Sequence, residues 1–224
     1  MEESLIDYLG SYLTEERKSR MKSVLDNRTD FITVVLEDIN HAHNASAVMR
    51  TCDCFGIQNL HVIEDEHKYK VNKYVVRGSE NWITLHRYRE EDIENRKVCV
   101  DKLKSEGYKI VVTSPHATKS FDEIPLDSKI ALCFGGEKTG ITKELYALAD
   151  EEVNIPMYGF TESFNISVSA ALILSSMVSK LHNSDVDWGL PHEEKTKLLK
   201  QWYTQSLKNG EFYEAEFNRL REEK

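Results

Sequence analysis

The sequence lacks the features that mark secreted, membrane-spanning and zinc-binding proteins. Its opening residues, MEESLIDYLGSYLTEERK, include neither a basic stretch nor a long apolar one, so we expect no secretory signal. The longest weakly polar run, residues 166–178, contains four serines and is too short to cross a bilayer. The four cysteines form no CxxC pair, and none falls with a histidine at zinc-finger spacing. We therefore expect a cytoplasmic protein with reduced thiols, no metal and no membrane contact.

Basic residues are fewer than acidic ones, which disfavours a polyanionic partner. The chain has 29 lysines and arginines against 38 aspartates and glutamates, and its formal net charge is −9 at pH 7. Basic residues are nevertheless concentrated in ERKSRMK and in HKYKVNKYVVR, where a solvated surface explains them as well as a nucleic-acid contact does. The candidate nucleic-acid-binding residues in these two segments are Arg17, Lys18, Arg20, Lys22, Lys68, Lys70 and Lys73.

Short apolar segments alternate with helix-like segments, which predicts an α/β fold. FITVVLE, NLHVIE, WITLHRY, YKIVVTS, KIALCFG and EEVNIPM are rich in β-branched residues and predict buried strands. Helices are predicted at 42–55, 90–106 and 142–149. Because strands that alternate with helices usually pair in parallel, we expect a mostly parallel sheet flanked by helices.

The two ends of the chain differ in character from its centre. At 224 residues, 40% of them hydrophobic, the chain can bury one large core. Residues 183–224 contain turn residues and then two charged amphipathic segments, and a further helix is predicted at 14–25. We expect an N-terminal helical extension over 1–29, a central domain over 30–182 and a C-terminal helical extension over 183–224.

Polar residues follow the first predicted strand, where a parallel sheet would bind a ligand. This stretch is NHAHNASAVMR, in which Asn44 can cap a helix that begins with small residues. Arg50 lies further along, among residues that look buried. Arg50 either pairs with a core carboxylate or faces a phosphate or sugar hydroxyl.

Two further polar stretches follow later strands. In FGGEKTGIT, the paired glycines let the backbone approach a ligand, and Glu137 can accept hydrogen bonds from it. Ile141 stands where a P-loop has its lysine, which argues against a nucleotide triphosphatase. In FTESFNIS, Ser163 and Asn165 precede a small, apolar helix, and capping explains only one of them.

The three polar stretches together resemble the ordered motifs of one enzyme family. NASAVMRTCDCFGI, CFGGEKTGIT and IPMYGFTESFNISVSAALIL are similar to the motifs of the SpoU branch of the SPOUT RNA ribose 2'-O-methyltransferases. The resemblance covers about residues 30 to 180 and is strongest to the TrmH-type enzymes, which methylate a guanosine in the tRNA D loop. It implies a C-terminal trefoil knot, S-adenosylmethionine as the cofactor, tRNA as the partner, and a homodimer.

The resemblance also implies which residues act. Asn44 and Arg50 match the first motif, Glu137 the second, and Ser163 and Asn165 the third, and these five are the implied catalytic residues. The implied cofactor contacts are Thr113, Gly135, Gly136, Glu137, Ile155, Met157, Ser163, Phe164 and Asn165.

The implied reaction is displacement at a sulfonium methyl carbon by a ribose 2'-hydroxyl, which must lose or share its proton. The family assigns the activation of this hydroxyl to Arg50. A guanidinium is not deprotonated in proteins, so we expect Arg50 to orient the hydroxyl while another group takes the proton.

Other functions stay open on the sequence alone. The same methyl transfer to rRNA, or to another position of tRNA, is the main alternative. A catalytically silent RNA-binding relative would be expected to lack Arg50 or Asn165, and both are present. A nucleotide hydrolase is disfavoured because the P-loop lysine is missing.

Overall fold

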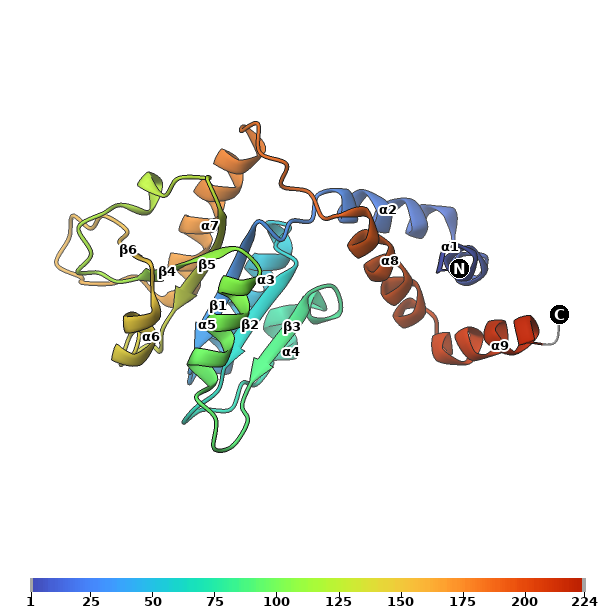
Figure 1. The fold of residues 1–224 in the computed structure, drawn as a ribbon, viewed down its shortest axis with the longest axis horizontal. Helices are drawn as coiled ribbons and strands as arrows, with labels where there is room; N and C mark the ends of the chain where they lie inside the picture. The colour runs from blue at the N-terminus through green and yellow to red at the C-terminus, as the bar shows by residue number, and fades with distance from the viewer. Residues whose placement is uncertain (1, 223–224) are drawn as a thin grey trace. The chain divides into compact units, whose positions relative to one another are not determined.

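A six-stranded parallel sheet forms the centre of the fold. The computed structural model describes residues 2–222. The strands are ordered β3-β2-β1-β5-β4-β6, and neighbouring strands pair in parallel. They span Ile32–Glu37 (β1), Asn59–Ile63 (β2), Thr84–Tyr88 (β3), Tyr108–Thr113 (β4), Lys129–Phe134 (β5) and Glu151–Val153 (β6). The prediction of a mostly parallel sheet flanked by helices is confirmed (Figure 1).

Helices lie between the strands and at both ends of the chain. They span Glu2–Gly10 (α1), Glu15–Asp26 (α2), Ala42–Cys54 (α3), Lys73–Val76 (α4), Asn95–Ser105 (α5), Lys143–Leu148 (α6), Ile166–His182 (α7), His192–Ser206 (α8) and Gly210–Glu222 (α9). Short 3-10 turns lie at Ser79–Asn81 and Phe121–Glu123.

Two predicted elements are shorter in the structure. The helix predicted from residue 90 begins at Asn95, because Asp92 adopts a left-handed φ of 60° that an α-helix does not include. The Asn95 side chain instead closes a loop by hydrogen bonds to the N–H and the carbonyl oxygen of Glu90. The last strand ends at Val153, before Pro156, which has no N–H to donate to a neighbouring strand.

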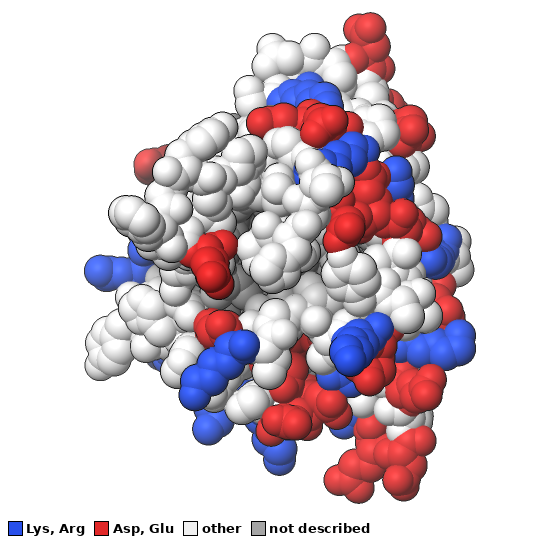
Figure 2. Space-filling view, turned by 90° about the vertical axis from the view of Figure 1, so that its left-hand side faces the viewer, with Lys and Arg blue, Asp and Glu red and all other residues white. Residues whose placement is uncertain are grey.

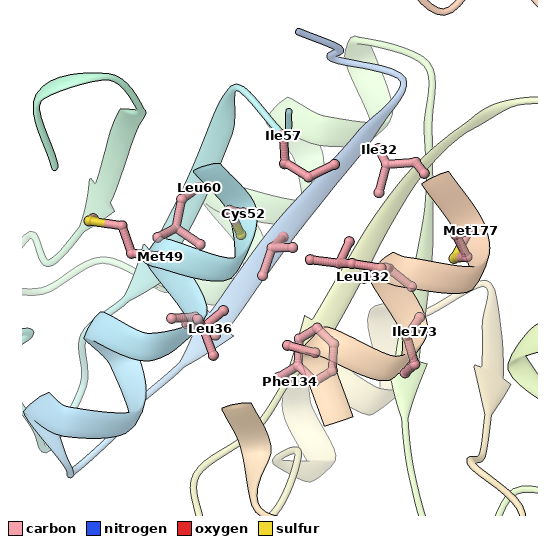
Figure 3. Close-up of a cluster of buried hydrophobic side chains, with 14 of the residues drawn as sticks. Ile32, Leu36, Met49, Cys52, Ile57, Leu60, Leu132, Phe134, Ile173 and Met177 are labelled. Atoms are coloured by element: carbon pink, nitrogen blue, oxygen red, sulfur yellow. The ribbon is translucent and has the colours of Figure 1, made fainter. Parts of the chain in front are cut away.

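Hydrophobic side chains fill both faces of the sheet. Along β1 they alternate, so that Val34 and Leu36 join one cluster and Val35 joins the other. The first cluster includes Met49 of α3 and Ile173 of α7, two helices that pack against each other (Figure 3). Residues of α5 and α6 belong to the second cluster. All four cysteines are free, as expected, and three of them are buried.

The chain divides into two compact units. One contains the segments up to Arg28 and from Gly189 onward, and the other is Thr29–Trp188. In the first unit, α1 packs against α8 and α9, and the Arg28 guanidinium lies 5.6 Å from the centroid of the Trp202 ring. The helices predicted as two separate extensions thus share one unit, while the predicted limits of the central domain and the trefoil knot stay predictions. Within residues 2–222, no helix is both long and apolar enough to cross a membrane.

Two stacked histidines lie between β2, β3 and α5, of which His61 is buried and His86 is half-buried. His61 and His86 are partners in the parallel ladder, and their ring centroids lie 4.4 Å apart. His61 Nδ1 lies 2.9 Å from the Tyr88 hydroxyl oxygen. Burial, and then the nearby His86 and Lys102, lowers the pKa of His61 to about 3. Burial, and then Lys102, lowers the pKa of His86 to about 4, so both rings are neutral in the folded protein at pH 7.

We expect the free energy of unfolding to fall as the pH drops from about 6.5 toward 4. In that range the unfolded chain binds protons at both histidines and the folded protein does not, which costs up to about 1.4 kcal/mol per pH unit for each histidine. Urea titrations at several pH values should therefore show a shallower slope for His61→Gln than for the wild type. His116→Gln, which changes an exposed histidine of the same unit, is the control. An unchanged slope in His61→Gln would show that His61 is not held neutral by the fold.

Candidate functional site

A cavity of about 660 Å³ opens at the carboxyl edge of the sheet, among the loops that follow β4, β5 and β6. Figure 2 views the molecule from the left-hand side of Figure 1 and shows a hollow bordered mostly by uncharged side chains. The cavity is lined by all nine residues that the sequence implies as cofactor contacts, namely Thr113, Gly135, Gly136, Glu137, Ile155, Met157, Ser163, Phe164 and Asn165. The fold therefore brings together residues from the end of β4 and from the loops after β5 and β6.

The glycine-rich loop after β5 folds back on itself. The Gly140 N–H donates to the Gly136 carbonyl oxygen over 2.8 Å, and Gly140 has a left-handed φ of 65°. A Cβ atom at Gly135 would lie 2.1 Å from the Gly140 carbonyl, which is far inside van der Waals contact. Gly135 and Gly140 are thus required by the turn that carries Glu137, before any ligand is considered.

A chain of hydrogen bonds joins the three polar stretches. Asn44 Nδ2 donates to Glu137 Oε1 over 2.8 Å, and Asn165 Nδ2 donates to Asn44 Oδ1 over 3.1 Å. Asn165 Oδ1 accepts from the N–H and the hydroxyl of Ser167, at 2.9 and 2.6 Å. Asn44 donates its amide N–H to Glu137 and so presents its amide oxygen to Asn165, and every donor in this series of hydrogen bonds points toward Glu137. These contacts hold three distant segments of sequence in one arrangement.

Ser163 and Asn165, the two polar residues before α7, have different roles in the structure. Asn165 caps the helix, since its side chain accepts from the N–H of Ser167. Ser163 is exposed at the cavity, and its hydroxyl has no hydrogen-bond partner among the residues that the structure describes. Phe164, between them, is 43% exposed and also lines the cavity. Capping thus accounts for Asn165 alone, and the Ser163 hydroxyl is available to a ligand.

Arg50 is exposed on α3. His43 and Cys54, which precede and follow it on the same face of the helix, are exposed as well. Within residues 2–222, the Arg50 guanidinium forms no ion pair or hydrogen bond, which removes the alternative of a pair with a core carboxylate. Neither Asn44 nor Arg50 lines the cavity, so the structure places only the second and third stretches on its wall.

Glu37, the last residue of β1, is fully buried and was missed by sequence reasoning. Its carboxylate accepts from Arg96 Nε at 2.5 Å, from the Thr142 hydroxyl at 2.5 Å and from the Thr142 N–H at 2.9 Å. Burial would lower the pKa of Arg96, but hydrogen bonds to Glu37 and Asp65 outweigh it and raise that pKa. The available signal was an acidic residue that closes an otherwise apolar strand, FITVVLE.

The residues predicted to contact RNA lie in both compact units. On α2, Arg17, Arg20 and Lys22 are exposed, whereas Lys18 is half-buried and pairs with Glu15 at 2.5 Å. The remaining three, all exposed in the other unit, are Lys68, Lys70 and Lys73. Their role stays a prediction.

Asp38, Glu66 and His67 place possible metal-ligand atoms within 4.8 Å of one another. Hydrogen bonds account for part of this cluster, since Asp38 Oδ2 lies 2.9 Å from His67 Nδ1 and Asp38 Oδ1 accepts from the N–H groups of Asp65 and His67. Burial would raise the pKa of Asp38, but these hydrogen bonds outweigh it and lower that pKa. The expectation that the protein holds no metal stays a prediction.

The chain is similar to several known proteins. Residues 31–175 match the model of the SpoU rRNA Methylase family. The chain is 41% identical over 214 residues to the tRNA (guanosine(18)-2'-O)-methyltransferase of Borreliella burgdorferi, which covers 95% of this chain and 96% of the relative. The crystal structure of the A. aeolicus TrmH/SpoU tRNA modifying enzyme matches with a TM-score of 0.76 at 29% identity, over 86% of this chain and 98% of that one. The SpoU methyltransferase AviRb from Streptomyces viridochromogenes, solved with the cofactor AdoMet, shares the fold, with a TM-score of 0.58 at 21% identity over 72% of this chain and 62% of that one.

We expect Asn44→Asp to destabilise the protein more at pH 8 than at pH 5. The substitution replaces the amide that lies 2.8 Å from Glu137 Oε1 with a second carboxylate. Two neighbouring carboxylates raise the pKa of the pair, so the repulsion, on the order of 1 kcal/mol when both are ionised, is relieved by acid. Thermal unfolding at both pH values, each relative to the wild type, measures this. Asn44→Ala loses the same hydrogen bonds without adding charge, so its melting temperature should fall equally at both pH values. A fall that is independent of pH in Asn44→Asp would contradict the contact between Asn44 and Glu137.

Proposed function

The chain belongs to the SpoU rRNA Methylase family, and from this premise we propose that it transfers a methyl group from S-adenosylmethionine to the ribose 2'-hydroxyl of guanosine 18 in tRNA. The observation that carries the proposal is the hydrogen-bond chain from Glu137 through Asn44 to Asn165, beside a cavity lined by the nine implied cofactor contacts. The choice of tRNA is supported by the Borreliella burgdorferi relative, which is named for this reaction and aligns over nearly the whole chain.

The cavity suits S-adenosylmethionine in size and in chemistry. Its volume of about 660 Å³ lies in the range of small-molecule sites. Ile155 and Met157 offer apolar surface to a ring, and the glycine loop leaves backbone atoms open to polar groups. Thr113 already donates its hydroxyl to the Cys133 carbonyl oxygen at 3.0 Å, so its oxygen can only accept from a ligand. When bound, S-adenosylmethionine supplies an electrophilic methyl group on its sulfonium sulfur.

Arg50 is the residue that we assign to the acceptor hydroxyl. Its exposed guanidinium has directed N–H donors that suit a ribose oxygen or an adjacent phosphate. Because a guanidinium keeps its proton, Arg50 orients the 2'-oxygen and stabilises the negative charge that develops there. The proton passes to a second group, for which an RNA phosphate or a residue of a second copy is suitable. Glu137, Asn44 and Asn165 hold the surrounding loops by their hydrogen bonds, and the Ser163 hydroxyl, which has no partner among the described residues, is available to the cofactor.

We infer that the working form is a homodimer that uses α7. Val168 and Leu172 are each 42% exposed at successive turns of this helix, and Ser175 and Ser179 continue the same exposed side. Small residues allow a second helix to approach closely, and burying the apolar pair would favour association. Asn165 caps the N-terminus of the same helix, so a dimer formed in this way has its site near the subunit boundary.

Phosphate contacts are assigned to the basic residues of α2 and of the segment 68–73. Phosphate neutralisation depends on local positive charge, so such clusters can bind tRNA despite the net charge of −9. Action on tRNA would place the protein in the cytoplasm.

Methylation of unmodified tRNA transcripts tests the function directly. We expect purified protein with S-adenosylmethionine to yield one 2'-O-methyl group, mapped by nuclease digestion and mass spectrometry to guanosine 18. A transcript with 2'-deoxyguanosine at that position lacks the acceptor and should gain none. Methyl transfer to rRNA alone, or to another tRNA position, would replace the proposed substrate, and failure of the wild type to bind the cofactor or its demethylated product would refute the proposed chemistry.

We expect Arg50→Lys and Arg50→Ala both to abolish turnover while cofactor affinity and melting temperature stay near those of the wild type. Arg50 is exposed and unpaired among the described residues, so its removal should change stability by no more than about 0.5 kcal/mol. Lysine offers a point charge without the planar fork, so the loss should be confined to the transition state and cost about 3 kcal/mol or more. Single-turnover methyl transfer measures it. An Arg50→Lys protein within about tenfold of the wild-type rate would contradict the assigned role.

A further inference from the structure

The glycine-rich loop between β5 and α6 is held at both ends. At its start, Gly135 follows directly from β5, and the hydrogen bond between Gly136 and Gly140 closes the turn. At its end, Thr142 donates both its N–H and its hydroxyl to the buried carboxylate of Glu37. The same Thr142 hydroxyl oxygen accepts from the N–H of Leu145 and so caps α6. One side chain on β1 thus fixes where the loop ends.

The environment of Glu37 makes this contact specific. Its side chain is 1% exposed, and Arg96 of α5, 18% exposed, is its charge partner. A buried ion pair adds little net stability over apolar packing, because desolvation offsets the attraction. Its value lies in the geometry that it imposes, since both carboxylate oxygens are occupied by donors at defined positions. This is the arrangement expected of a group that sets a loop in place.

Glu37 and Thr142 do not line the cavity assigned to the cofactor. They line a second cavity, of about 840 Å³, on which residues 136–140 also lie. Residues 136–140 therefore form a wall shared by the two cavities. Glu37 and Thr142 line only the cavity of about 840 Å³. Any effect of Glu37 or Thr142 on cofactor binding must act through the position of this wall.

We propose that Glu37 is a positioning residue for the methyl donor: its carboxylate, through Thr142, holds the loop 135–142 in the conformation that binds S-adenosylmethionine. The inference rests on the proposed function, because it assigns the 660 Å³ cavity to that cofactor. Without the hydrogen bonds between Glu37 and Thr142, the loop 135–142 gains alternative conformations, and cofactor binding must then restore the ordered conformation.

Thr142 variants provide the test, because Glu37→Gln alone leaves Arg96 without its charge partner and risks misfolding. Thr142→Val removes the hydroxyl, and with it both the hydrogen bond to Glu37 and the cap of α6, but keeps the backbone N–H donor and the shape of the side chain. We expect it to raise the Kd for S-adenosylhomocysteine, measured by calorimetry, by about tenfold, the scale of one hydrogen bond to a charged group. Thr142→Ser keeps the hydroxyl and should stay within about twofold of the wild type.

Thr33→Val is the matched control. Thr33 is fully buried on the same strand and donates its hydroxyl to the Asn59 carbonyl oxygen at 2.8 Å, remote from the loop in the hydrogen-bond pattern. It should lower the melting temperature without changing the Kd. Equal Kd values for Thr142→Val and Thr33→Val, or failure of Thr142→Ser to restore affinity, would overturn the positioning role alone. Absence of binding to the wild type would instead overturn the proposed function, and the inference with it.

Discussion

The parallel pairing of β1 with β5 is the contact on which the candidate site depends. Leu36 lies opposite Phe134, so the chain leaves both strands at the same edge of the sheet. Beyond that edge, Asn44 and Glu137 meet although 93 residues separate them. In an antiparallel pair, the segments that follow the two strands would leave at opposite edges. The strand order therefore creates the site, and the loops only supply its chemistry.

Two buried carboxylates at this edge hold the functional segments in comparable ways. Glu37 receives Arg96 and holds the loop that carries Glu137. Glu64, just after β2, receives Arg87 at 2.6 and 2.7 Å and also accepts from the N–H of Tyr69 at 2.9 Å. Burial would raise the pKa of Glu64, but the hydrogen bonds from Arg87 and from the Tyr69 backbone outweigh it and lower that pKa. Some of the carboxylates of this acidic chain thus act as buried hydrogen-bond acceptors that hold loops in place. One of these loops carries the basic residues of 68–73.

The site combines a rigid frame with groups left open to a ligand. Glu137, Asn44 and Asn165 are committed to one another, whereas the Ser163 hydroxyl has no hydrogen-bond partner among the described residues. Arg50, on α3, is likewise unpaired in residues 2–222 and exposed. The groups that already hydrogen-bond to one another need not rearrange when a substrate binds, and the unpaired donors can form new hydrogen bonds to that substrate. This division agrees with methyl transfer, in which the protein orients two reactants and provides little covalent chemistry of its own.

Local sequence determined the strands, the cap at Asn165 and the polar stretches, because apolar runs, Asn165 before a helix and glycines in a tight turn act over a few residues. The prediction that Asn44 caps a helix was wrong, because α3 begins at Ala42 and Asn44 lies inside it, with its side chain hydrogen-bonded to Glu137 and Asn165. The same reasoning placed the start of α5 at residue 90 instead of Asn95, because helix propensity does not predict the left-handed conformation of Asp92. Only the tertiary structure decided that Glu37 meets Thr142 across 105 residues, that Arg50 is exposed, and that the terminal helices share one unit. These outcomes depend on strand order and on which helix faces are covered, and both are set by long-range packing that no short window of sequence contains.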